Sequence, residues 1–150
     1  MSDKGTSGGT TYRMTPVRRL GNAVVGVMVR VGVGPVHLLT TRGRKTGEPR
    51  TTPVTPVEVD GTTYLVAPYG AVDWVRNARA AGRVTLRRGR HRVEYAVHEV
   101  TAGESGPVLK EYLSVAGVTQ PWFTARPGSP VEDFVAEADR HPVFALSPAA

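Results

Sequence analysis

The pattern of apolar and polar positions divides the chain into an early helical part and a longer part made mostly of strands. From about Pro16 to Val31, apolar residues recur at helical spacing while polar residues follow on another face. This spacing predicts an amphipathic helix, preceded by a flexible leader over residues 1–11 that is rich in Gly, Ser and Thr. The apolar face of the predicted helix comprises Leu20, Val24, Val27, Met28 and Val31.

Short runs of apolar and β-branched residues predict strands in the rest of the chain. Two prolines in the run at 50–59 are typical of an edge strand or a bulged one. The dipeptide Asp60-Gly61 is the strongest hairpin signal, and Arg88-Gly89 separates two further strands. The predicted strands cover residues 36–41, 50–59, 62–68, 83–88, 91–100 and 143–146.

A helix between the strands is predicted over Trp74–Ala81, where Ala and Arg predominate. Asp73 is a candidate to cap its first turn, and Gly82 is expected to end it.

Two more helices are predicted in the last third of the chain. One covers Ser105–Val115, with Pro107 in its first turn and Gly117 at its end. A short one opens at Ser129-Pro130, after a loop over residues 119–129. About six antiparallel strands with two to four helices predict a single α+β domain over residues 12–150, built on a small barrel.

The amino-acid composition excludes some kinds of functional site. The 150 residues include no cysteine, which excludes disulfides and thiolate metal sites. The four histidines lack the spacing of known metal motifs, so no metal is expected. The most apolar segment, Ala23–Val36, is shorter than a membrane span and contains Arg30, so we expect a cytoplasmic protein.

The charge is unevenly distributed. Residues 1–92 hold 16 Lys and Arg against 5 Asp and Glu, whereas residues 93–150 hold 3 against 8. A one-sided basic surface concentrates anionic ligands, although it also serves simply to keep a protein in solution.

The turn between the first two predicted strands, GRKTG at 43–47, resembles a phosphate cradle. It is neither a P-loop nor a Rossmann turn, because the order and spacing of its glycines differ from both motifs. Its glycines are expected to expose backbone N–H groups, Thr46 adds a hydroxyl, and Arg44 and Lys45 add charge. On pattern alone, the turn is either a local anion site or a charged surface turn.

Three segments in order, LLTTRGRKTGEPRTTPV, VDGTTYLVAPYG and DWVRNARAAGRVTLRRG, resemble the deazaflavin-dependent nitroreductase family of actinobacteria. The most specific pieces are the GRKTGxxR loop and the W-x-x-N of the following helix. The resemblance implies a split β-barrel, of the type that also binds FMN. It also implies an oxidoreductase that uses the deazaflavin coenzyme F-420 to reduce quinones, nitroaromatics and related acceptors.

The resemblance also implies site residues. The basic loop would contact the phosphate of the coenzyme, residues 50–54 would run along the deazaflavin, and residues 67–70 would lie by its ring system. The segment between Gly70 and Trp74 is shorter than usual in the family, which affects the ring pocket more than the phosphate end. The implied coenzyme-binding residues are Arg44, Lys45, Thr46, Arg50, Thr51, Thr52, Pro53, Val54, Ala67, Pro68, Tyr69, Gly70, Trp74, Arg76 and Asn77.

A quinone or nitro acceptor that takes a hydride develops negative charge, which O–H or N–H donors stabilise. Tyr69, Tyr112 and Trp122 are the candidate donors or lining groups, and the alternative for each is a core aromatic. The predicted helix at 16–31 and the aromatic loop around Trp122 are candidates to roof the acceptor site. That helix would otherwise cover the barrel edge or touch a membrane from the cytoplasmic side.

Three other functions remain open at this point. An FMN-dependent split barrel would share the architecture and the basic loop, and a non-catalytic carrier of an anionic ligand would share the loop alone. Seven arginines between residues 76 and 92 raise the third, nucleic-acid binding. We do not expect nucleic acid as a partner, because no base-stacking aromatics lie among these arginines. The protein is expected to be a monomer or a homodimer.

Overall fold

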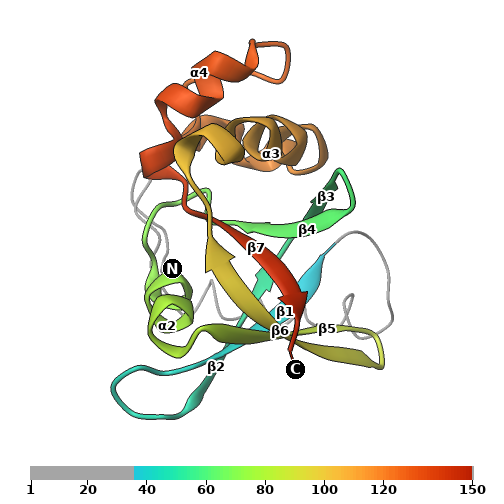
Figure 1. The fold of residues 1–150 in the computed structure, drawn as a ribbon, viewed down its shortest axis with the longest axis vertical. Helices are drawn as coiled ribbons and strands as arrows, with labels where there is room; N and C mark the ends of the chain where they lie inside the picture. The colour runs from blue at the N-terminus through green and yellow to red at the C-terminus, as the bar shows by residue number, and fades with distance from the viewer. Residues whose placement is uncertain (1–35, 150) are drawn as a thin grey trace.

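The computed structural model describes residues 36–149, so the predicted leader and the predicted helix at 16–31 lie outside the described residues. Within residues 36–149, seven antiparallel strands form one curled sheet in the order β2-β1-β5-β6-β7-β4-β3 (Figure 1). The strands are β1 (His37–Arg42), β2 (Pro49–Val54), β3 (Val57–Val59), β4 (Thr62–Val66), β5 (Arg83–Arg88), β6 (His91–Glu99) and β7 (Val143–Pro148). The predicted α+β barrel is therefore confirmed.

Helices cover two sides of this sheet. In Figure 1, α3 (Ala102–Val115) and α4 (Val131–Ala136) lie together at one end of the barrel, and α2 (Asp73–Ala81) lies beside its lower half. Two short 3-10 turns, η1 (Gly117–Trp122) and η2 (Ala138–Arg140), connect the last elements. No helix within residues 36–149 is long and apolar enough to span a membrane.

The alternation along β4 and β7 separates two hydrophobic clusters. Tyr64 and Val66 on β4 face α3 and α4, whereas Leu65 faces the inside of the barrel. The inner cluster includes Leu39 from β1 and is closed by Val75 and Ala78 of α2. Both faces of β4 and of the first half of β7 are thus largely buried, which favours a single pairing register, because a shift by one residue would exchange the two faces.

The two predicted hairpins are confirmed. Asp60 and Gly61 both have positive φ, 51° and 81°, as a tight turn between β3 and β4 requires. Gly89 has φ 61° at the turn between β5 and β6.

The single strand predicted over 50–59 is wrong, because this run forms two strands at opposite edges of the sheet. Among residues 36–149, β2 pairs with β1 only, and β3 pairs with β4 only. The two strands are joined by Thr55 and Pro56, and a proline has no N–H to continue a ladder.

Helix α2 begins and ends close to the predicted residues, but its cap differs. The N-cap is Val72, which makes no side-chain capping bond, so the predicted cap by Asp73 is wrong. Asp73 is the first helical residue, where its negative charge still favours the positive end of the helix. Gly82 ends the helix with φ 74°, as predicted.

Helix α3 starts three residues earlier than predicted, so Pro107 lies in the second turn rather than the first. The hydroxyl of Thr101 accepts a hydrogen bond from the Glu104 N–H, as in a capping box. Helix α3 ends at Val115 as predicted, and Ala116 is its C-cap. Gly117 begins η1, which occupies the first part of the predicted loop; α4 follows Pro130 as predicted.

Replacing Gly106 by alanine is expected to destabilise the fold. A Cβ at this buried position would lie 2.6 Å from Val135 Cγ2 and 2.9 Å from Val131 Cγ1, so α3 and α4 would have to move apart. We expect overpacking of about 1–3 kcal/mol to exceed a helix-propensity gain of about 1 kcal/mol. Urea denaturation measures the difference. Gly103→Ala in the same helix is the control, because no atom lies within 4 Å of its added Cβ. An unchanged stability of the Gly106 variant would contradict the close packing of α3 on α4.

Candidate functional site

The GRKTG loop is a compact turn held by its own polar groups. The Gly43 N–H donates to the Glu48 carbonyl at 2.7 Å, and the Gly47 N–H donates to the Gly43 carbonyl at 2.8 Å. The expectation that these glycines expose their N–H groups is therefore wrong. Gly47 has φ 77°, and its role is to allow the turn. The N–H groups of these two glycines are therefore engaged within the turn.

Three polar side chains of this loop can contact an anion. Lys45 and Thr46 are exposed, and the Thr46 hydroxyl accepts the Glu48 N–H at 3.1 Å. Because a hydroxyl is also a donor, Thr46 can still donate its proton to a ligand. Arg44 has an exposed fraction of 26% for its side chain. The loop thus presents two cations and one hydroxyl.

Asn77 of α2 holds the loop in place. Its Oδ1 accepts the Arg44 backbone N–H at 3.2 Å and the Arg44 Nη1 at 2.8 Å, while its Nδ2 donates to Thr41 Oγ1 at 3.3 Å. Asp73 lies 3.6 Å from Arg44 Nη2. Asn77 is only 2% exposed. The predicted pair of motifs, the basic loop and the W-x-x-N helix, is therefore one physical unit.

The remaining predicted residues on β2 and α2 lie around this unit. Strand β2 carries Arg50, Thr51, Thr52, Pro53 and Val54 along the sheet edge that starts at the loop.

On α2, Trp74 packs against Phe144, with ring centroids 5.8 Å apart, and against the inner cluster. Its packing role is thereby established, and a contact with coenzyme stays a prediction. Arg76 is exposed on the same helix.

The segment Ala67–Gly70 follows β4 and brings two predicted aromatic residues together. Ala67 and Pro68 are buried, and the Ala67 N–H donates to the Pro142 carbonyl at 2.8 Å. The rings of Tyr69 and Trp122 meet edge to face with centroids 4.7 Å apart. Two of the three candidate donor or lining groups thus form one contact.

Tyr112 lies on the buried face of α3, among the core residues, and is 4% exposed. Burial above all, and then the nearby Tyr69, raise the pKa of Tyr112, against a smaller opposing effect of Thr119. Its hydroxyl therefore keeps its proton throughout the physiological range, which allows it to donate a hydrogen bond but not to act as a base.

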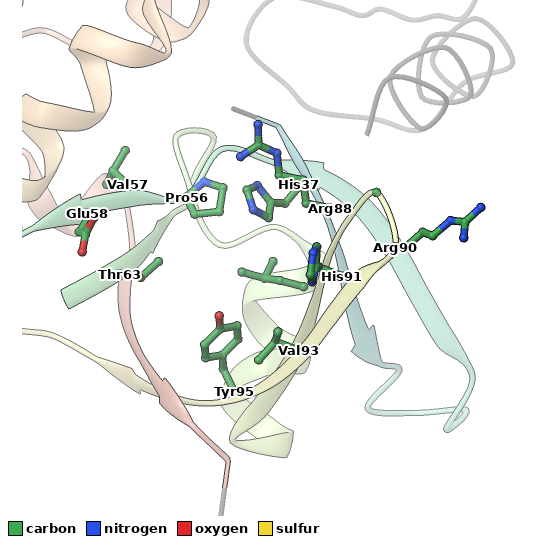
Figure 2. A pocket seen from close by; sticks show the side chains of 12 residues that line it. His37, Pro56, Val57, Glu58, Thr63, Arg88, Arg90, His91, Val93 and Tyr95 are labelled. Atoms are coloured by element: carbon green, nitrogen blue, oxygen red, sulfur yellow. The ribbon is translucent and has the colours of Figure 1, made fainter. Parts of the chain in front are cut away.

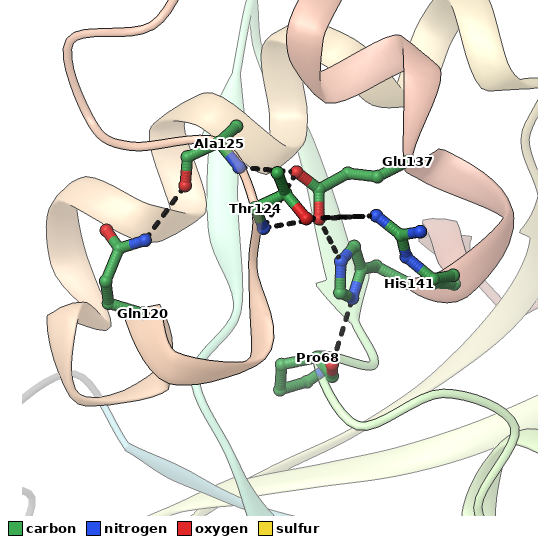
Figure 3. A network of polar contacts seen from close by, with 7 residues as sticks. Pro68, Gln120, Thr124, Ala125, Glu137 and His141 are labelled. Atoms are coloured by element: carbon green, nitrogen blue, oxygen red, sulfur yellow. Dashed lines mark hydrogen bonds and ion pairs between the residues drawn. The ribbon is translucent and has the colours of Figure 1, made fainter. Parts of the chain in front are cut away.

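A buried acid–base pair, Glu137 and His141, was not predicted from the sequence. The Glu137 carboxylate accepts the backbone N–H groups of Thr124 at 3.0 Å and Ala125 at 2.6 Å, and contacts His141 Nε2 at 2.8 Å (Figure 3). His141 Nδ1 lies 2.9 Å from the Pro68 carbonyl oxygen. The only sequence signal was the i, i+4 spacing of the two residues, which is too common to identify a site.

The stability of the protein is expected to fall as the pH drops below the usual carboxyl value of 4.5. Burial acts to raise the pKa of Glu137, but the N–H of Thr124, His141 and the N–H of Ala125 together outweigh burial and lower it. A carboxyl with a lowered folded-state pKa stabilises the fold above the unfolded value, and this contribution is lost in acid. Chemical denaturation at roughly one-unit steps from about pH 6 to about pH 3, a range that includes this value, measures how the free energy of unfolding changes with pH.

Glu137→Gln is expected to flatten this acid dependence, because the amide does not titrate. Glu132→Gln on the exposed side of α4 is the matched control and should keep the wild-type slope. Equal slopes for the wild type and Glu137→Gln would show that the buried carboxylate does not contribute.

A cavity of about 880 Å³ opens in the barrel at the end of β1 opposite to the basic loop (Figure 2). Its wall combines apolar side chains with arginines and histidines. No predicted site residue lines it. The lining residues are His37, Pro56, Val57, Glu58, Thr63, Leu86, Arg88, Gly89, Arg90, His91, Val93 and Tyr95. Across residues 36–149, no cluster of His, Asp and Glu side chains is arranged to hold a metal ion.

Several solved structures share this fold. A structure described as an F420-H2 dependent reductase, FDR-A, is 22% identical with a TM-score of 0.52, and the match covers 75% of this chain and 94% of that one. A structure described as a domain-swapped dimer is 22% identical with a TM-score of 0.56, covering 87% and 96%. A putative pyridoxamine 5'-phosphate oxidase from Listeria innocua is 13% identical with a TM-score of 0.52, covering 84% and 93%.

These similarities show the split-barrel fold. The family model described as F420H(2)-dependent quinone reductase matches residues 11–121, which include the basic loop, Asn77 and Tyr69. This match spans most of the chain and contains both parts of the loop–helix unit. The protein therefore belongs to the F420H(2)-dependent quinone reductase family, whose members are oxidoreductases that use coenzyme F-420.

Proposed function

We propose that this protein uses reduced coenzyme F-420 to reduce a quinone, with nitroaromatic and similar electron-poor compounds as further acceptors. The family match supports the coenzyme and the reaction class. The observation that carries the proposal is the basic loop fixed to α2 by Asn77, because it presents a preformed group of cations beside a sheet edge.

The donor set fits this coenzyme. Its phosphodiester and oligo-glutamate tail are anionic, and Arg44, Lys45 and Arg50 supply three cations within seven residues of the chain. Thr46 adds a hydroxyl donor. Because Arg44 is already held by Asn77 and Asp73, little conformational freedom is lost when it contacts a phosphate.

The ring system of the coenzyme would be bound by β2, by the segment that follows β4 and by α2. Residues 51–54 of β2 would run along the deazaflavin, and residues 67–70 would lie against its rings. Trp74 would close the site from the helix, with Arg76 and Asn77 beside it. The buried, hydrogen-bonded position of residues 67 and 68 supports this, since a rigid wall orients a planar ring without further reorganisation.

When bound, the coenzyme supplies hydride transfer. The protein excludes water, orients the acceptor and stabilises the negative charge that the acceptor develops. Tyr69 and Tyr112 would donate from their hydroxyl groups, and Trp122 would line the pocket. The contact between the Tyr69 and Trp122 rings supports a shared aromatic wall for a flat acceptor.

The proposal also covers the roof of the acceptor site, the oligomeric state and the location of the protein. Phe123 and Trp122 would roof the acceptor, together with the predicted helix at 16–31 that lies outside the described residues. We propose that the protein acts in the cytoplasm as a monomer or homodimer, with peripheral contact to the membrane through that helix. The neighbour described as a domain-swapped dimer supports the homodimer.

Titration of the purified protein with oxidised coenzyme F-420 and with FMN, followed by fluorescence, tests the proposal. We expect saturable binding of F-420 that is tighter than that of FMN. Reduced F-420 should then be oxidised when menadione is added, with turnover that depends on the protein. Preference for FMN would favour the flavin-dependent alternative. Binding of F-420 without turnover on menadione or a nitroaromatic compound would leave a carrier as the function.

A further inference from the structure

We propose that Glu137 and His141 are positioning residues that hold the two halves of the aromatic wall, Tyr69 and Trp122, in fixed relation. The inference rests on the proposed function, because it assigns these residues to the ring end of the coenzyme and acceptor site. Neither residue belongs to the basic loop, to β2 or to α2. Both are 2% exposed, so they act through the segments that they contact.

The first contact is with the segment that carries Tyr69. His141 Nδ1 lies 2.9 Å from the carbonyl oxygen of Pro68, the residue before Tyr69. The neighbouring Pro142 carbonyl accepts the Ala67 N–H at 2.8 Å. Residues 141 and 142 therefore hold this segment at two successive points.

The second contact is with the segment that carries Trp122. The His141 ring stacks on Phe123, with centroids 4.0 Å apart and planes 18° from parallel. The Glu137 carboxylate accepts the N–H groups of the next two residues, Thr124 and Ala125. Figure 3 shows the pair between the two segments, with Pro68 below His141 and with Thr124 and Ala125 to the left of Glu137.

The bond between the two residues completes the link. The two ring nitrogens of His141 face two acceptors, the Pro68 carbonyl and the Glu137 carboxylate. The charge-assisted bond of 2.8 Å to Glu137 Oε1 is stronger and more directional than a neutral one. Buried groups joined in this way leave few alternative arrangements for the segments around them.

His141→Ala and the more conservative Glu137→Gln test this role, with Val108→Ala as the control. Val108 is buried in the same cluster as Phe123 and has an apolar side chain that forms no hydrogen bond, so it reports loss of stability alone. With reduced F-420 and menadione, we expect kcat to fall by about 10²-fold in both test variants when measured per folded molecule, as for misplaced reacting groups. The dissociation constant for F-420 should change much less, because Arg44 and Lys45 remain.

A readout without coenzyme separates this inference from the proposed function. The near-UV circular dichroism of the unliganded protein should lose the signal of the Tyr69–Trp122 contact in both test variants while the far-UV spectrum is kept. The Val108 control should retain both spectra. If the test variants keep the near-UV signal, or lose no more kcat than Val108→Ala, the positioning role is wrong. If instead the wild type neither binds F-420 nor reduces menadione, the proposed function fails, and the near-UV result alone decides whether the pair orders the aromatic wall.

Discussion

Replacing Arg44 and Lys45 together by alanine is expected to weaken binding of coenzyme F-420 by about 2–4 kcal/mol, roughly 30- to 700-fold, at low salt. Two charge-assisted contacts to the phosphate end are lost, while the ring end is untouched. The difference between wild type and variant should shrink as salt rises, because screening already weakens the wild-type interaction. Fluorescence titration at low and high ionic strength measures both effects.

The double variant Arg87→Ala/Arg92→Ala is the matched control. These two arginines are cross-strand partners on β5 and β6, and Arg87 is paired through the sheet with Leu38, at the end of β1 away from the loop. The control removes the same charge but no predicted coenzyme contact, so it should keep near wild-type affinity. Equal losses in both double variants would mean that general charge attracts the coenzyme and that the GRKTG loop is only a charged turn.

Replacing Asn77 by alanine is expected to lower the free energy of unfolding by about 2–3 kcal/mol and to weaken binding of F-420. The buried amide makes three hydrogen bonds, two with Arg44 and one with Thr41. Without it, the part-buried Arg44 backbone N–H and the buried Thr41 hydroxyl lose this partner, and only the longer Arg44–Asp73 contact still ties the loop to α2. Thermal denaturation and coenzyme titration measure the two consequences.

Val75→Ala distinguishes the loop from the general stability of α2. Val75 lies two residues before Asn77 on α2, is fully buried and packs in the inner cluster. The control should lose stability to a similar degree, about 1–3 kcal/mol, but keep its affinity for F-420. If both variants lose affinity in proportion to their stability, Asn77 supports the helix and has no separate role in presenting the cations.

Elements with a local cause were predictable from the sequence. The Asp60-Gly61 turn needs positive φ at both residues, and Gly82 ends α2 for the same kind of reason. The basic loop was found because its charges are contiguous. The resemblance assigned Asn77 to the same coenzyme site, but the hydrogen bonds that join Asn77 to Arg44 were not predicted.

Features that depend on distant partners were missed. The run at 50–59 reads as one strand, and only its pairing with β1 on one side and β4 on the other divides it. The glycines at 103 and 106 obscured the capping signal of Thr101, since glycine lowers helix propensity. Glu137 and His141 contact Pro68 and residues 123–125, and these partners lie too far away in the sequence for a local pattern to indicate them.

The link at Thr55 and Pro56 also bears on the two edges of the sheet. It joins the two outermost strands of the sheet that residues 36–149 form, and the Cα atoms of Val54 and Val57 are three peptide units apart, at most about 11 Å. Two sheet edges that are tied together at such a short distance leave little room for a strand from another molecule to add to either of them at that point. Lengthening this link with flexible residues would release both edges at once, so the first expected cost is self-association through edge pairing rather than loss of the inner core.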